Sequence, residues 1–417
     1  MHVPTPARHA GAPAARPAVH KAVRHARYDL DQRPFIVIWE VTRACDLACR
    51  HCRAEAMPQR HPGELTTDEA RRLMDDIAAF GPPPPLFVMT GGDPFKRPDL
   101  FELVHYGTTI GLPVSVSPSG TPTLTEDNLR RLRQAGAVAL SLSLDGSTAA
   151  IHDRFRQVEG VYDWTLTGWR AARALGFKVQ INTTVSTHNV DDLPDILRIV
   201  RELGAMTWSV FFLVPTGRGR QLASLPPETV EDVLHFLYDA AKVLSLKTTE
   251  AHHYRRVVIQ RQVLEQRGIP AHEVLPLGET YRRLRRRLQE VAPDADLDAP
   301  APMRRTPLDV NAGRGFVFIS HTGVVHPSGF LPIAAGNVRL HPLPIIYRES
   351  PLLQALRDPD RLGGRCGRCE FRTVCGGSRS RAFGVSGDPL AEEPWCPYEP
   401  GSFPFQEDVR AYLAATP

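Results

Sequence analysis

Short apolar runs alternate with amphipathic segments between about residue 34 and residue 225. The runs are rich in β-branched and aromatic residues, and this composition over so few positions is typical of buried parallel strands. We expect six strands, at residues 35–41, 86–92, 113–120, 137–146, 178–186 and 208–217. The pattern therefore predicts an α/β fold.

Segments between these runs carry hydrophobic residues at helical spacing, as at 66–80, 124–136 and 189–204. Thr66 or Thr67 can cap the first of them. Six strands joined by right-handed helical crossovers predict a partial (βα)6 TIM-type barrel, whose chemistry belongs at the C-terminal ends of the strands. The unusual residues fall there: Cys45–Cys52, Gly91–Pro94, Asp145, Asn182 and Pro215–Arg220.

The pattern changes after residue 225. Residues 226–310 are mainly helical and end in a Pro-rich linker, and the basic helix at 281–290 is expected to be a solvated face rather than a binding patch. A hairpin at 315–320 and 324–330 then leads into a Gly-rich tail that a metal would order. We therefore divide the chain into four parts: 1–33, 34–225, 226–310 and 311–417.

The composition of the chain excludes several classes of function. The chain has 417 residues, and its 50 basic and 46 acidic residues give a net charge of +4, which argues against a nucleic-acid partner. Residues 1–33 are rich in Ala, Pro, His and Arg and are expected to be a disordered leader. They lack the apolar core of a secretory signal, and no stretch approaches the 20 or so apolar residues of a membrane span. We expect no membrane association and a cytoplasmic location.

The seven cysteines fall into two clusters, one at 45–52 and one at 366–396. A disulfide framework would not be distributed in this way in a reducing compartment, so metal ligation is the better interpretation.

The first cluster, Cys45, Cys49 and Cys52, has the spacing CxxxCxxC directly after the first strand. Three thiolates at this spacing can ligate three irons of a [4Fe–4S] cluster and leave the fourth iron open to a small chelating ligand. A zinc site would require a fourth protein ligand. His51 is the only local candidate, and its position next to Cys52 would strain the ring, so the cluster is favoured.

This motif resembles the signature of the radical S-adenosylmethionine (SAM) superfamily. The resemblance implies that the open iron binds the methionine part of SAM, and that reduction cleaves SAM to a 5′-deoxyadenosyl radical that abstracts hydrogen from a substrate. It also implies that no protein side chain beyond the cluster ligands is catalytic, because the radical belongs to the cofactor.

Three more segments resemble SAM-binding motifs of this superfamily. Gly91-Gly92-Asp93-Pro94 resembles the GGEP motif, with Asp in place of Glu. Ser143 and Asp145 lie in a segment similar to the one that contacts the carboxylate and ribose of SAM, and Asn182 is expected to be a ribose partner. Arg156 is expected either to pair with the methionine carboxylate or to form a structural salt bridge.

The second cluster, Cys366, Cys369, Cys375 and Cys396, resembles the C-terminal SPASM extension of radical SAM enzymes. That extension houses two auxiliary clusters, but Ser328 and Ser378 stand where further cysteines would be needed. The resemblance therefore implies one auxiliary [4Fe–4S] cluster, two clusters in all, with a zinc ribbon as the alternative. Complete cysteine ligation suits electron relay or structural support rather than substrate binding.

Five further segments are distinctive: 39–43, 212–219, 330–338, 375–382 and 391–396. They resemble the haem-biosynthesis branch of these enzymes, which includes the Fe-coproporphyrin decarboxylase and the haem d synthesis enzyme. The resemblance extends over residues 34–400 and implies a haem-like or other carboxylate-bearing small molecule. The candidate partners of its carboxylates, ring edge or iron are Arg218, Arg220, Arg255, Arg256, Arg379, Arg381, His252, His253 and Tyr254. The alternative for each arginine is that it holds loops together.

Two other functions remain open. One is a maturase that installs a crosslink or epimer in a short ribosomal peptide, although residues 1–33 are too short for a peptide-recognition domain. The other is a non-enzymatic metal-binding protein, against which the complete set of SAM motifs argues. An enzyme of this class would take its electrons from a flavodoxin-type or ferredoxin-type donor.

Overall fold

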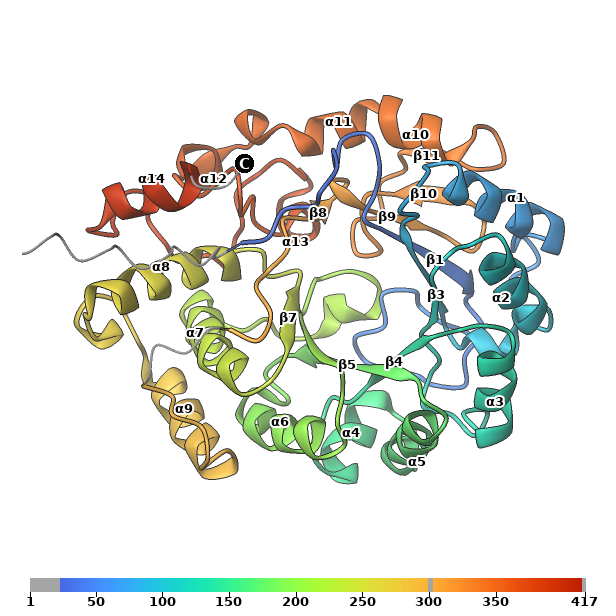
Figure 1. The fold of residues 1–417 in the computed structure, drawn as a ribbon, viewed down its shortest axis with the longest axis horizontal. Helices are drawn as coiled ribbons and strands as arrows, with labels where there is room; N and C mark the ends of the chain where they lie inside the picture. The colour runs from blue at the N-terminus through green and yellow to red at the C-terminus, as the bar shows by residue number, and fades with distance from the viewer. Residues whose placement is uncertain (1–22, 299–302, 415–417) are drawn as a thin grey trace, which may run out of the picture.

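A curved parallel sheet forms the centre of the molecule, and helices cover its outer face (Figure 1). The computed structural model describes residues 23–298 and 303–414. The parallel strands follow one another in chain order: β1 (Ile36–Thr42), β2 (Leu86–Gly91), β3 (Val114–Val116), β4 (Ala139–Ser143), β5 (Lys178–Val185), β6 (Thr207–Phe212) and β7 (Leu246–Thr249). This arrangement is a partial barrel, and it confirms the predicted fold class.

The six predicted strands correspond to β1 to β6. The seventh strand, β7, was not predicted, and it pairs in parallel with β6 inside the region that we assigned to helices and a linker. Its sequence is short, and only Leu246 is buried, so it carries no strong strand pattern. The barrel sheet therefore continues beyond the boundary that we placed at residue 225.

The two faces of the sheet have different surroundings. In β1, Val37 and Trp39 are buried in the main apolar core, whereas Ile36 and Ile38 line an internal cavity. This alternation follows from the two-residue repeat of a strand. The outer helices are α1 (Thr67–Ala78), α2 (Leu100–Thr109), α3 (Glu126–Gln134), α4 (Ala149–Arg156), α5 (Val161–Ala174) and α6 (Leu193–Glu202).

Thr66 is the residue that caps α1. Its hydroxyl accepts a hydrogen bond from the Glu69 N–H at 3.2 Å, and the Glu69 carboxylate accepts one from the Thr66 N–H at 2.8 Å. This reciprocal pair satisfies two of the free N–H groups at the helix start.

The predicted hairpin is present, and it extends the same sheet. β9 (Gly315–Ile319) lies parallel to β1, and β10 (Val324–His326) returns antiparallel beside β9. β8 (Asn311–Ala312) and β11 (Gly336–Asn337) complete this side of the molecule. The cysteine-rich tail beyond it contains α10 (Leu343–Glu349), α11 (Pro351–Arg357), α12 (Gly364–Arg368), α13 (Arg379–Ser386) and α14 (Gln406–Ala414).

Three helices lie between β6 and β8: α7 (Pro227–Val243), α8 (Tyr254–Arg267) and α9 (Glu279–Val291). The basic residues of α9 face acidic neighbours. Arg283 pairs with Asp191 at 2.6 Å, and Arg287 pairs with Asp195 at 3.0 Å. These exposed pairs agree with a solvated helix face rather than a binding patch.

The expectation of a disordered leader was wrong for residues 23–33. Val23 and Leu30 are buried, and the Arg24 N–H donates to the Pro307 carbonyl at 2.8 Å. These apolar side chains order the segment, because they pack against the body of the protein. The rest of the expected leader, residues 1–22, lies outside the described residues.

Candidate active site at the carboxyl ends of the strands

The loop that follows β1 carries the first three cysteines. Cys45 and Cys49 are buried, Cys52 is half-buried, and all three are free thiols. A backbone N–H donates to Cys45 Sγ at 3.4 Å, another donates to Cys52 Sγ at 3.5 Å, and Arg156 Nη1 donates to Cys49 Sγ at 3.6 Å. Donors around sulfur are the groups that stabilise and tune cluster thiolates.

The electrostatics of this loop fit a metal cluster. Burial raises the pKa of Cys45 to about 11, and burial also raises the pKa of Cys49 even though the Arg156 guanidinium opposes the shift. Thiols of this kind keep their protons at neutral pH unless a metal displaces them. Three such sulfurs with N–H donors, at the edge of a cavity, form a donor set that suits the [4Fe–4S] cluster and its open side.

The end of β2 packs closely against the segment that leads into the cysteine loop. A Cβ atom at Gly91 would clash with the carbonyl oxygen of Thr42, and one at Gly92 would clash with the carbonyl oxygen of Ala44. The Gly92 N–H donates to the Thr42 carbonyl at 2.9 Å. Glycine is required at both positions because no side chain fits between the two segments.

Asp93 and Pro94 lie behind these glycines, and neither contributes to the cavity wall. The buried Asp93 carboxylate accepts hydrogen bonds from the Thr121 and Thr123 hydroxyls, both at 2.8 Å. It therefore ties the end of β2 to the loop after β3. Pro94 is buried at the start of a short 3-10 turn.

Arg156, the last residue of α4, makes the salt bridge that we considered as one alternative. Its Nη2 pairs with the buried carboxylate of Asp145, which also accepts the Thr184 N–H at 2.7 Å. The guanidinium beside Asp145 holds the pKa of that carboxyl below its usual range, although burial opposes the shift. Arg156 also lines the cavity, so the pair orients its guanidinium next to the Cys49 sulfur.

Ser143 and Asn182 are neighbours across β4 and β5, and both line the cavity. Asn182 Oδ1 accepts a hydrogen bond from Gln180 Nε2 at 2.8 Å, and this bond fixes the orientation of the Asn182 side chain. Ser119 was missed by the sequence analysis. Its hydroxyl donates to the Gly92 carbonyl at 2.6 Å and lies 3.7 Å from Cys45 Sγ, so it joins two predicted motifs.

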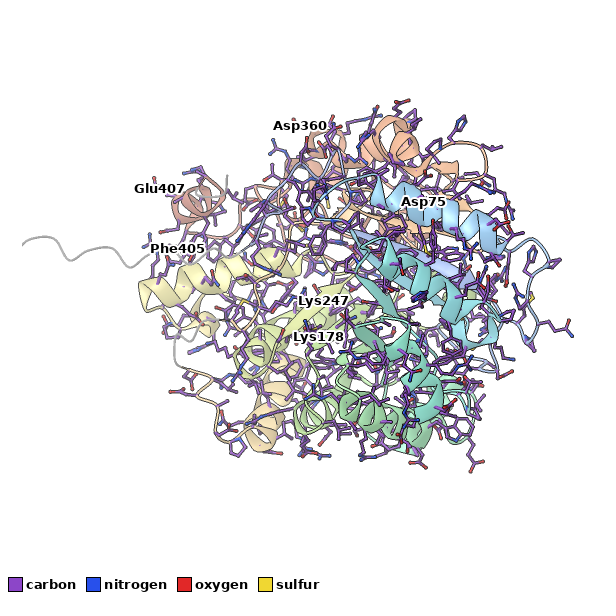
Figure 2. All side chains as sticks on the ribbon, turned by 45° about the vertical axis from the view of Figure 1, so that its right-hand side comes forward. Asp75, Lys178, Lys247, Asp360, Phe405 and Glu407 are labelled. Carbon is purple, nitrogen blue, oxygen red and sulfur yellow. The ribbon has the colours of Figure 1, made fainter. Side chains whose placement is uncertain are left out.

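A cavity of about 690 Å³ occupies the barrel interior. It begins at the cysteine loop, at the carboxyl ends of the strands, and reaches residues at their amino ends such as Leu86 and Lys178. Figure 2 shows Lys178 and Lys247 in the central part of the molecule. A volume of this size suits a cofactor or a small molecule.

The four late cysteines share one site in the tail. Burial raises the pKa of Cys375. The neighbouring thiols of Cys396, Cys366 and Cys369 raise it further. Backbone N–H groups donate to Cys366 Sγ at 3.2 Å and to Cys375 Sγ at 3.4 Å. This donor set again fits a cluster, and none of the four residues lines the cavity. Within residues 23–298 and 303–414, no three His, Cys, Asp or Glu side chains are grouped to hold a single metal ion.

A carboxylate and serine network lies where further cysteines are lacking. The buried Glu250 accepts hydrogen bonds from the hydroxyls of Ser328 and Ser380, both at 2.9 Å, and from the hydroxyl of Ser378. The hairpin and α13 are therefore joined through Glu250 by hydrogen bonds.

Five of the six candidate arginines hold loops together. Arg218 donates to the Cys49 carbonyl at 2.9 Å, and Arg255 donates to the Val374 carbonyl at 2.8 Å. The others pair internally: Arg256 with Glu231 at 2.6 Å, Arg379 with the Ala391 carbonyl at 2.6 Å, and Arg381 with Glu393 at 2.9 Å. Arg220 is exposed. All five arginines therefore have structural partners, and Arg218 and Arg255 also line the cavity.

The residues at the start of α8 differ in access to the cavity. His252 and Tyr254 line it, and His253 does not. Burial, with the nearby Arg255 and Arg379, lowers the pKa of His252 well below its usual value. The His252 imidazole is therefore neutral at physiological pH.

A model of the Radical SAM superfamily matches residues 39–200. The fold is also shared with solved structures: Streptococcus suis SuiB bound to S-adenosylmethionine superposes with a TM-score of 0.63 at 12% identity, covering 88% of this chain and 78% of that one. Native anSMEcpe with bound AdoMet gives 0.60 at 14% identity, with 92% and 97% covered. The chain belongs to the radical SAM superfamily and is an enzyme of that class.

The relatives define the branch within this superfamily. The "AdoMet-dependent heme synthase" of Oleidesulfovibrio alaskensis is 42% identical over 374 residues, which cover 88% of each chain. The "Fe-coproporphyrin III synthase" of Methanosarcina barkeri is 31% identical, covering 89% of each, and the "Pre-heme d1 synthase" of Dinoroseobacter shibae is 30% identical, covering 87% and 85%. The chain is thus most similar to the haem-biosynthesis branch. Radical SAM enzymes use a [4Fe–4S] cluster and SAM. No helix of the described residues is long and apolar enough to cross a membrane.

Proposed function

We propose that this enzyme acts on an iron-bearing tetrapyrrole with carboxylate side chains. The observation that carries the proposal is the cavity that connects the cysteine loop with the amino ends of the barrel strands. It has room for a macrocycle beside the SAM motifs, and its lining combines apolar side chains with a few polar groups. The names of the relatives support the same substrate class.

Cys45, Cys49 and Cys52 would hold the [4Fe–4S] cluster of the active site. When bound, the reduced cluster and SAM supply a 5′-deoxyadenosyl radical that takes a hydrogen atom from the substrate. The chain positions these groups: Gly91 and Gly92 allow the end of β2 to approach the loop, and Ser143, Asn182 and Arg156 present polar groups to the cavity. Asp93, Pro94 and Asp145 would support SAM binding from behind this wall.

Cys366, Cys369, Cys375 and Cys396 would hold a second [4Fe–4S] cluster. Their position away from the cavity wall supports a role in electron transfer or in holding the tail, rather than in binding substrate. Electrons would come from a flavodoxin or ferredoxin. Seven free cysteines suit the reducing conditions of the cytoplasm.

His252 is proposed to face the iron of the tetrapyrrole. It lines the cavity, none of the described residues makes a hydrogen bond to its ring, and Nδ1 is buried. A neutral imidazole is the form that binds iron.

Anaerobic turnover tests the proposal. The reconstituted enzyme, given SAM, dithionite and Fe-coproporphyrin III, should form 5′-deoxyadenosine together with a tetrapyrrole of altered mass. A variant with Cys45, Cys49 and Cys52 all replaced by Ala should form neither. If Fe-coproporphyrin III neither binds nor stimulates SAM cleavage, the proposed substrate is wrong, and a peptide becomes the better candidate, as for SuiB bound to its precursor peptide.

A further inference from the structure

Lys247 and Arg305 are two cations of the cavity that have no carboxylate partner. Lys247 lies near the amino end of β7, and Arg305 precedes the hairpin; both line the cavity. Arg305 Nη1 donates to the Thr207 hydroxyl at 3.1 Å, and the side chain of Lys247 makes no hydrogen bond or ion pair with the described residues. Two other buried arginines, Arg256 and Arg381, are by contrast paired with buried carboxylates.

The pKa shifts of these two residues agree with their lack of carboxylate partners. The pKa of Lys247 falls to about 8, first because the side chain is buried and then because the Arg305 guanidinium repels its charge. Burial and Arg24 likewise lower the pKa of Arg305. A charge withdrawn from water without a counter-ion is costly, so an anion bound between these groups would be favoured strongly.

The position of the cations relates them to the rest of the site. Lys178, Thr207 and Leu246 are the first residues of β5, β6 and β7, and parallel strands begin at the same side of a barrel. The cysteine loop lies at the opposite ends of the strands. An anion bound by Lys247 and Arg305 would thus lie away from the SAM motifs.

Apolar side chains line the part of the cavity at the amino ends of the strands. Residues from β1 and β2 and from the neighbouring segments line this part of the cavity: Phe35, Ile36, Leu86, Met206, Leu308 and Phe316. Apolar side chains next to two cations match a ligand with a flat hydrophobic body and carboxylate arms.

We infer that Lys247 and Arg305 bind a carboxylate of the substrate that the radical does not attack, and so fix which edge of the macrocycle faces SAM. This assignment rests on the proposed function, because it names the substrate of that same cavity. Lys178, exposed at the first position of β5, also lines the cavity. Figure 2 labels Lys178 together with Lys247.

Binding can be measured without turnover, by titrating the SAM-free anaerobic protein with Fe-coproporphyrin III and following the Soret band. Lys247→Met and Arg305→Met should each weaken binding about tenfold or more, since each removes a charge-assisted hydrogen bond. Lys247→Arg should retain most of the affinity. Arg304→Met is the matched control, because Arg304 is exposed and donates to the Lys242 carbonyl outside the cavity lining.

The tetramethyl ester of the same tetrapyrrole distinguishes the contribution of the carboxylate charge to binding from the contribution of the macrocycle's shape. The wild-type protein should bind the ester more weakly than the acid, and this preference should shrink in Lys247→Met. Iron bound per chain and the circular dichroism spectrum should be equal in all variants, which shows that the fold and the cluster are intact.

Two results would count against the assignment, and they differ. If wild type and both Met variants bind Fe-coproporphyrin III equally, the carboxylate site is wrong and the proposed function stands. If wild type does not bind Fe-coproporphyrin III, the proposed function fails, and this assignment fails with it.

Discussion

Arg156 lies 3.6 Å from the sulfur of Cys49 through one nitrogen, while its other terminal nitrogen pairs with the buried Asp145. The end of α4 is thereby joined to the cysteine loop. One side chain thus contacts both Asp145 and the sulfur of a proposed cluster ligand.

Replacing Arg156 by Met should destabilise the protein and lower the reduction potential of the first cluster. The Asp145 carboxylate would be left buried without its counter-charge, at a cost of about 3–5 kcal/mol. The lost donor to Cys49 also makes the sulfur more electron-rich. Urea unfolding and a redox titration followed by EPR measure the two effects. Asp145→Asn is the control, because it keeps the donor to sulfur; equal potentials in wild type and Arg156→Met would contradict the role assigned to the guanidinium.

Gly92→Ala should impair assembly of the first cluster. The added methyl group would overlap the Ala44 carbonyl, which belongs to the backbone just before Cys45 and has little freedom to move. Iron bound per chain and the yield of 5′-deoxyadenosine should both fall. Gly363→Ala is the matched control, because a Cβ atom at this position would lie 3.5 Å from its nearest neighbour, the Leu390 carbonyl oxygen. Full activity of Gly92→Ala would show that the loop adapts.

The anaerobically purified protein should contain about eight irons, four for each cluster. Changing Cys375 to Ala should remove ligation in the tail and leave about four, with the EPR signal of the SAM-binding cluster retained. Metal analysis together with EPR checks this. About four irons with one zinc in the wild type would support the zinc ribbon instead.

Ligation of a tetrapyrrole iron by His252 should persist between pH 8 and pH 6. The folded-state pKa of His252 is lowered well below 6.5, so the ring stays in the neutral, iron-binding form across this range. Because the lowered pKa disfavours protonation in the folded state, the ligand form would be lost only at more acidic pH. The Soret position of the Fe-coproporphyrin III complex should therefore stay constant over this range, and His252→Ala should shift it. An unshifted band in His252→Ala would rule out this ligand.

The sequence alone was enough to predict the superfamily and the six strands β1 to β6, because cysteine spacing and strand patterns are local. It also identified the glycines of the β2 end. It did not predict β7, whose four residues carry too little hydrophobic pattern, and it treated residues 23–33 as disordered although Val23 and Leu30 are buried.

The tertiary structure decided which charges are available. From the sequence, Arg256 and Arg381 were candidates for binding the substrate, whereas Lys247 and Arg305 were not identified. Only the folded chain shows that Glu231 and Glu393 neutralise the first two, while the second pair faces the cavity without a carboxylate. The physical reason is that ion pairing depends on distances of a few ångströms between residues far apart in the chain, and residue type and spacing do not encode those distances.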